Sequence, residues 1–152
     1  MMDDKRRQTR LTFEDVLVAQ TKLLSLIRRK KTRNVGLSSE EEEEFPSLIA
    51  WSTLSHASTI CHFTNDDGRK THFNIYSFAL ELKSLRGDSA ILTDGPSGVK
   101  YKVPISKLWV FLEKELTNIF PYALEEAIHM SREAPISERA TAHRFSMEQS
   151  KY

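Results

Sequence analysis

The fold is decided by residues 59–74, TICHFTNDDGRKTHFN, in which two alternating segments flank a turn. Thr59 to Thr64 and Thr71 to Tyr76 alternate apolar with polar side chains, which is the period of a strand with one buried face. The turn between them, Asn65-Asp66-Asp67-Gly68, is a strong hairpin signal, because an Asp-Gly pair tolerates positive φ angles. This stretch therefore predicts a β-hairpin.

The segment that follows the hairpin changes the phase of its apolar residues. They move from odd to even positions, as Phe73 and Ile75 are followed by Tyr76, Phe78, Leu80 and Leu82. Either a bulge near residue 75 or a helix that begins near Ser77 explains the change. We expect a long bulged strand, and the choice between strand and helix over residues 77–85 stays open at this stage.

Helical spacing of apolar residues is found on both sides of the hairpin. The first helix has Thr12 as its expected N-cap and is stopped by Asn34 and Gly36. The second is expected over Pro46 to Leu54, since proline suits the first turn of a helix. The third is expected to be capped by Ser106, and Pro121 either kinks it or starts another helix.

A second hairpin is expected before the last helix. Ala90 to Asp94 and Val99 to Val103 flank the turn Gly95-Pro96-Ser97-Gly98. The predicted order is helix, helix, two hairpins, helix. This is an α+β fold, in which a small antiparallel sheet (two hairpins) packs against N-terminal and C-terminal helices, with flexible termini.

The length of 152 residues accommodates one ordinary domain. We expect a basic disordered arm over residues 1–10, a single α+β domain over residues 11–133 and a flexible tail over residues 134–152. Inside the domain, residues 35–45 are expected to be an acidic linker or the start of a short acidic helix capped by Ser38 or Ser39.

Composition excludes several classes of protein. A single cysteine excludes a disulfide framework, an iron–sulfur site and a multi-cysteine zinc site. No apolar run reaches the ~18–20 residues of a membrane-spanning helix, and no signal peptide opens the chain. We therefore expect an intracellular protein, in the nucleus and/or the cytoplasm.

The net charge of +1 conceals three blocks of different charge. Residues 1–34 hold ten basic and four acidic side chains, a net charge of +6. Residues 35–50 hold five glutamates, Glu40 to Glu44, and no basic residue. Residues 51–152 hold 12 basic and 12 acidic side chains. Such asymmetry is typical of an electrostatic interaction region.

Two basic clusters flank the first helix and are the main candidate binding residues. Lysine and arginine neutralise phosphates, and a flexible arm can follow a groove or a backbone. The second cluster also resembles a nuclear import signal. The candidates are Lys5, Arg6, Arg7 and Arg10 in the first cluster, and Arg28, Arg29, Lys30, Lys31 and Arg33 in the second.

The acidic run suggests two further hypotheses. Ser38 and Ser39 precede glutamates, so an acid-directed kinase would accept them as phosphorylation sites. Glu40 to Glu44 could also fold back on Arg28 to Arg33 and mask them. A plain solvated acidic segment is the competing interpretation.

One pattern suggests metal-dependent chemistry. An acidic residue, a hairpin and then Glu-x-Lys resembles the PD-(D/E)xK signature of metal-dependent nucleases. By that resemblance Asp67, Glu81 and Lys83 would be the site, with carboxylates holding the metal ion. The pattern needs residues 77–83 to be a strand, because Glu81 and Lys83 would then share a face. An exposed strand edge of alternating charge is the favoured interpretation.

Cysteine and histidine residues gather near the first hairpin. Cys61 and His62 are neighbours that point to opposite faces of a strand, so Cys61 is expected to be a small buried apolar side chain. His62 and His72 flank the turn at similar distances and are expected to face each other as a cross-strand pair. No metal site and no cofactor is predicted.

These observations predict a small non-enzymatic accessory or regulatory protein that binds nucleic acid or a nuclear partner through its basic N-terminal region. Small size and charge blocks would also suit a viral accessory protein. One alternative is a protein–protein interaction or matrix-like oligomeric subunit that docks through apolar helices around Trp51 or Trp109. A less favoured alternative is a metal-dependent nuclease, and the basic arm could also hold an anionic membrane surface. The sequence leaves open RNA or DNA, and whether the chain forms homo-oligomers.

Overall fold

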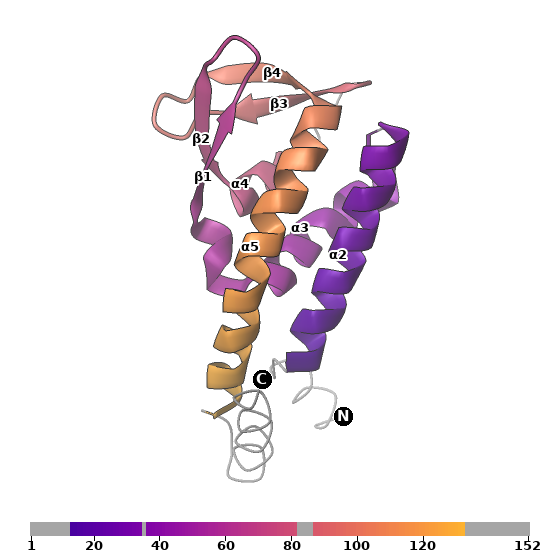
Figure 1. Cartoon of the computed structure of the whole chain (residues 1–152), viewed down its shortest axis with the longest axis vertical. Coiled ribbons are helices and arrows are strands. Elements are labelled where there is room, and N and C mark those ends of the chain that lie inside the picture. The colour runs from indigo at the N-terminus through magenta and orange to yellow at the C-terminus, as the bar shows by residue number, and fades with distance from the viewer. Residues whose placement is uncertain (1–12, 35, 82–86, 133–152) are drawn as a thin grey trace.

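Amphipathic helices and two hairpins make up the computed structural model, which describes residues 13–34, 36–81 and 87–132 (Figure 1). The hairpins lie together at one end of the molecule, and α2 and α5 extend side by side to the other end. The architecture is α+β, as expected. In chain order the elements are α2 (Phe13–Arg33), α3 (Ser39–Thr53), the 3-10 helix η1 (Leu54–Ser58), β1 (Ile60–Thr64), β2 (Lys70–Asn74), α4 (Ile75–Leu80), β3 (Ser89–Thr93), β4 (Lys100–Pro104) and α5 (Ile105–Arg132).

Helix α2 forms because its apolar residues recur at helical spacing and its last turn carries cations that complement the helix dipole. Val16, Leu23 and Ile27 lie on its buried face with no exposed surface. Asn34 ends the helix in a left-handed conformation, with a φ of 54°, and donates its N–H to the carbonyl of Lys30 at 2.7 Å. The predicted stop at Asn34 is confirmed, and the predicted N-cap Thr12 lies outside the described residues.

Helix α3 begins at Ser39, so of the two alternatives expected for residues 35–45 the acidic helix capped by Ser38 is confirmed, and residues 39–45 are not a linker. Ser38 is the N-cap: its hydroxyl accepts the N–H of Glu41 at 3.2 Å, and its own N–H donates to Glu41 Oε1 at 2.9 Å. This capping box satisfies two N-terminal donors, and glutamates in the first turn complement the helix dipole. The predicted start at Pro46 is wrong because these contacts stabilise the turns ahead of it, and Pro46 lies inside the helix.

The two hairpins form where they were expected, as separate two-stranded antiparallel sheets. A bridge joins them: His72 donates its backbone N–H to Asp94 Oδ1 at 2.8 Å and accepts the N–H of Gly95 at 2.7 Å. A Cβ at Gly95 would lie 3.2 Å from the carbonyl oxygen of His72. Glycine therefore permits the close approach of the second hairpin's turn to β2.

Residues 75–80 form the short helix α4, so the expected long bulged strand is wrong. Asn74 ends β2 and caps this helix, because its side-chain oxygen accepts the N–H of Ser77 at 2.7 Å. The buried residues Ile75, Phe78 and Ala79 then follow helical spacing, which accounts for the change of phase in the sequence.

Helix α5 packs against α2, α3 and η1, and it also contacts the hairpins. Leu108, Trp109, Leu112 and Leu116 are buried along it. At its hairpin end, the ring of Phe111 meets the rings of Phe63 in β1 and Phe73 in β2, with centroids 5.2 and 6.0 Å apart. The helix continues past the exposed Pro121 to Arg132, so Pro121 does not start a new helix.

A buried glutamine connects the three long helices. Gln20 of α2 is 4% exposed, and its Nε2 donates to the carbonyl oxygens of Ser52 in α3 and Phe120 in α5, both at 3.0 Å. Ser52 lies in the last turn of its helix, where carbonyl groups lack the usual helical donor. The amide therefore satisfies a carbonyl that the end of α3 leaves without one.

Replacing Gln20 with Leu should lower the free energy of unfolding by about 1–3 kcal/mol, because buried carbonyl groups lose their donor. Urea denaturation followed by circular dichroism measures this change. Ser25→Ala, on the exposed side of the same helix, is the control and should change stability by less than about 0.5 kcal/mol. Equal unfolding midpoints for the two variants would contradict a stabilising role for the Gln20 amide.

Candidate polyanion-binding surface

The two basic clusters belong to opposite ends of α2. The first cluster, Lys5, Arg6, Arg7 and Arg10, lies outside the described residues and precedes the start of the helix at Phe13. The second occupies the other end, near the hairpins (Figure 1). A helix of 21 residues is about 30 Å long, so Phe13, where the helix begins, lies far from the second cluster. We call the second cluster, Arg28, Arg29, Lys30, Lys31 and Arg33, the basic end of α2.

Glu113 of α5 holds two cations of the basic end. Its carboxylate accepts hydrogen bonds from Arg28 Nε and Lys31 Nζ, each at 2.7 Å. The hydrogen bonds from Lys31 and Arg28 hold the pKa of Glu113 below its usual value. The side chain of Arg28 remains 61% exposed. Exposed ion pairs of this kind contribute only about 0–1 kcal/mol to stability, so this contact mainly orients the two cations.

Glu41 of α3 holds two others in a more buried setting. It pairs with Arg29 and, at 2.9 Å, with Lys30 Nζ, and the Lys30 side chain is only 9% exposed. Burial alone would raise the pKa of Glu41. The backbone N–H of Ser38 and the ammonium group of Lys30 outweigh that effect and lower the pKa to about 2. The pair with Lys30 therefore belongs to the packing of α2 on α3.

Positive charge remains at the basic end after these pairs are formed. Four of the five cations pair with two carboxylates, so the five cations and two carboxylates together carry an excess of three positive charges. Arg28 and Arg29 keep 61% and 50% of their side-chain surface exposed, and Arg33 is exposed with no ion pair among the described residues. Lys30 is too buried to reach a ligand. The accessible cations are thus Arg28, Arg29, Lys31 and Arg33.

The masking hypothesis for the acidic run applies to one glutamate only. Within the described residues, Glu41 alone of the run pairs with the basic end. Glu40, Glu43 and Glu44 are exposed. The Ser38 hydroxyl is engaged in the capping box, and the exposed Ser39 begins the helix. Phosphorylation of either serine stays a prediction.

The nuclease-like pattern requires residues 77–83 to be a strand, but residues 75–80 form helix α4. Glu81 caps the C-terminus of α4 and accepts a hydrogen bond from the Thr93 hydroxyl at 2.8 Å. Asp67 lies in the first turn and accepts the N–H of Arg69 at 3.0 Å. Lys83 lies outside the described residues. No group of three or more His, Cys, Asp or Glu side chains is placed to hold a metal ion in the part of the chain that the structure describes.

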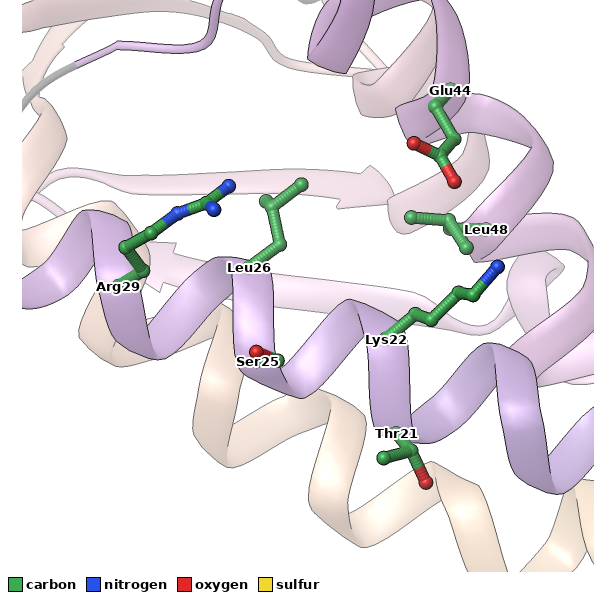
Figure 2. A pocket seen from close by; sticks show the side chains of 7 residues that line it. All are labelled: Thr21, Lys22, Ser25, Leu26, Arg29, Glu44 and Leu48. Atoms are coloured by element: carbon green, nitrogen blue, oxygen red, sulfur yellow. The ribbon is translucent and has the colours of Figure 1, made fainter.

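A groove between α2 and α3 was not anticipated from the sequence. It is open, has a volume of about 440 Å³ and has Leu26 and Leu48 among its lining residues (Figure 2). Its charged lining residues are Lys22 and Arg29 on α2 and Glu44 on α3. Sequence periodicity marks Leu26 and Leu48 as core residues. It does not show that the surfaces of two helices leave a hollow between them.

The two tryptophans named as docking residues differ in exposure. Trp109 is 1% exposed and packs edge-on against Phe45, with ring centroids 6.2 Å apart, so docking through Trp109 is ruled out in this fold. Trp51 of α3 is 41% exposed. It follows Leu48 by three residues, so it lies one turn beyond the groove on the same side of α3.

Comparison of the chain with protein families, with curated proteins and with solved structures finds no match. Among the described residues, no helix has the length and apolar character that crossing a membrane requires. The functional argument therefore rests on the geometry of the described residues.

The pH dependence of stability should reveal the ion pairs of Glu41. Its pKa is lowered from 4.5 to about 2 on folding, so its contribution is complete above pH 4.5 and is lost as the pH falls towards 2. Glu41→Gln should therefore be less stable than the native chain at neutral pH, by an amount that shrinks as the pH falls through this range. Urea unfolding at several pH values measures the difference.

The matched control for that experiment is Glu43→Gln, an exposed position on the same helix. It should leave the difference in unfolding free energy close to zero at every pH. A Glu41→Gln difference that stays constant from neutral to acid pH would show that its carboxylate charge does not stabilise the fold.

Proposed function

We propose that this chain is a non-enzymatic accessory or regulatory protein that binds nucleic acid through its basic N-terminal region, in the nucleus and/or the cytoplasm. The observation that carries the proposal is the excess of positive charge at the basic end of α2. Glu41 and Glu113 hold these cations against a packed helical framework, and three charges remain uncompensated within the group. A phosphate backbone is the common biological ligand for such a surface.

The chemistry of arginine supports this proposal. A guanidinium group has five N–H donors, and the contact of Arg28 with Glu113 uses its Nε. The remaining donors can bind phosphate oxygens while the carboxylate keeps the side chain in place. Contacts of this kind position a partner without reading its base sequence.

The arm adds a second group of cations, Lys5, Arg6, Arg7 and Arg10, which precede α2 in the sequence. We expect a nucleic acid to contact both groups, because each can neutralise phosphates. An import receptor would not need both groups, so the dependence of binding on the arm separates the two partners.

Binding to single- and double-stranded RNA and DNA should weaken steeply with salt. The slope of log K against log[salt] should fall by about one unit for each phosphate contact removed by Arg29→Gln or Arg33→Gln. Deletion of residues 1–10 should reduce this slope further. Fluorescence anisotropy over a salt series measures these slopes.

The control variant is Lys100→Gln/Lys102→Gln, which removes two exposed lysines from β4. It should leave the salt dependence nearly unchanged. Absence of binding to all four nucleic acids at low salt would overturn the proposal, and so would an equal effect of the β4 lysines. In either case the basic end would be an import signal or a charged helix end.

A second candidate function is a protein–protein interaction subunit, favoured by the groove between α2 and α3 and by exposed Trp51. An apolar floor with charged sides is the usual form of a site for an amphipathic helix. This function predicts assembly that is insensitive to salt, because burial of apolar surface is not screened by ions.

If the chain self-associates through this face, Trp51→Ser should shift it to the monomer at concentrations where the native chain is an oligomer. Light scattering coupled to size-exclusion chromatography measures the mass. Val110→Ser replaces a more exposed apolar residue on α5, 55% against 41% for Trp51, and should leave the mass unchanged. If the native chain stays monomeric at all concentrations, self-association through this face is excluded, and the partner would have to be a different protein.

A further inference from the structure

His62 of β1 and His72 of β2 are directly opposite in the first hairpin. The backbone N–H and carbonyl of His72 bond to Asp94 and Gly95 of the second hairpin, not to β1. The two histidines are therefore a non-hydrogen-bonded pair, the type in which opposite side chains come closest. Both side chains lie on the face of the hairpin that is not packed on the core.

The two imidazole rings have the spacing of ligands on one metal ion. Their centroids are 4.6 Å apart and their planes are inclined by 80°. A metal–nitrogen bond of about 2.0–2.1 Å places each ring centroid about 3.2 Å from the ion. A separation of 4.6 Å then corresponds to an angle of about 90° between the two ligands, as in square-planar or octahedral coordination.

A metal-binding histidine usually donates its second ring N–H to a carboxylate, and Asp94 is placed to accept that bond from His72. Oδ1 of Asp94 lies 3.4 Å from Nδ1 of His72, so a proton on Nδ1 leaves Nε2 free as a ligand. Oδ2 of the same carboxylate accepts the hydroxyl of Ser97 at 2.7 Å.

We propose that His62 and His72 form a binding site for a divalent transition-metal ion that imidazole favours and that accepts ligands at 90°, namely copper or nickel. Water molecules complete the coordination. The site is independent of the nucleic-acid function and uses none of its residues.

The neighbouring Cys61 does not add a third ligand. It faces the core, is 2% exposed, and burial raises the pKa of its thiol to about 12, whereas metal ions bind the thiolate. With two protein ligands, the site is weaker than a structural zinc centre, which has four. Its occupation would cross-link β1 to β2. Through Asp94 it would also reinforce the bridge between the hairpins.

The test is a titration of the full-length chain with nickel chloride, followed by calorimetry and by two-dimensional NMR. We expect saturable binding of one nickel ion, reversed by EDTA, and paramagnetic broadening centred on residues 60–64 and 70–74. His62→Gln and His72→Gln should each weaken binding by at least about tenfold. Both positions are on the solvent-facing side of the hairpin, so thermal melting should confirm that the variants fold.

His56→Gln is the matched control, because His56 is a half-buried histidine on η1 that contacts Glu126 rather than a second histidine. It should bind nickel as the native chain does. Two outcomes would overturn the proposal: no saturable binding by the native chain, or unchanged binding by the His62→Gln/His72→Gln double variant. The pair would then be a ring-packing contact alone.

Discussion

Burial of the apolar face of α2 between α3 and α5 is the constraint on which the rest of the structure depends. Val16, Leu23 and Ile27 have no exposed surface, and burying each such side chain contributes about 1.5–3 kcal/mol. Gln20 fixes the relative position of the helices, because one amide must reach carbonyl groups on both neighbours. In this arrangement α2 runs antiparallel to α3 and α5, and the cations at its C-terminal end form ion pairs with Glu41 and Glu113.

This arrangement of the helices gives the cations at the basic end of α2 two different roles. Lys30 is buried beside Glu41 and contributes to packing, because an unpaired buried ammonium group would be costly. Arg28, Arg29 and Lys31 form ion pairs that are partly exposed and add little stability, but these contacts keep the cations in fixed positions. The same carboxylates that hold the fold therefore also present the positive surface on which the nucleic-acid proposal rests.

The hairpin end of the molecule depends on a different interaction. Asp94 binds the backbone of His72 with one oxygen and the Ser97 side chain and backbone with the other, and Gly95 closes the contact. The two hairpins share no strand pairing, and this contact joins β2 of the first to the turn of the second. This contact also sets the orientation of His72, on which the proposed metal site depends.

Local sequence determined the hairpins, the stop of α2 at Asn34 and the α+β class, because turn chemistry and side-chain period act over a few neighbouring residues. For residues 39–45 and 75–80 it left a helix and another conformation open; the caps Ser38 and Asn74 decide for helix in both places, and the favoured bulged strand over 75–80 was wrong. It identified the basic cluster as candidate binding residues and predicted that His62 and His72 face each other, without predicting a metal site. Only tertiary structure decided that Lys30 is buried, that Glu113 and Glu41 share the cations, and that a groove lies between α2 and α3. Those features join residues far apart in the chain, and no local pattern encodes which distant carboxylate a cation will meet.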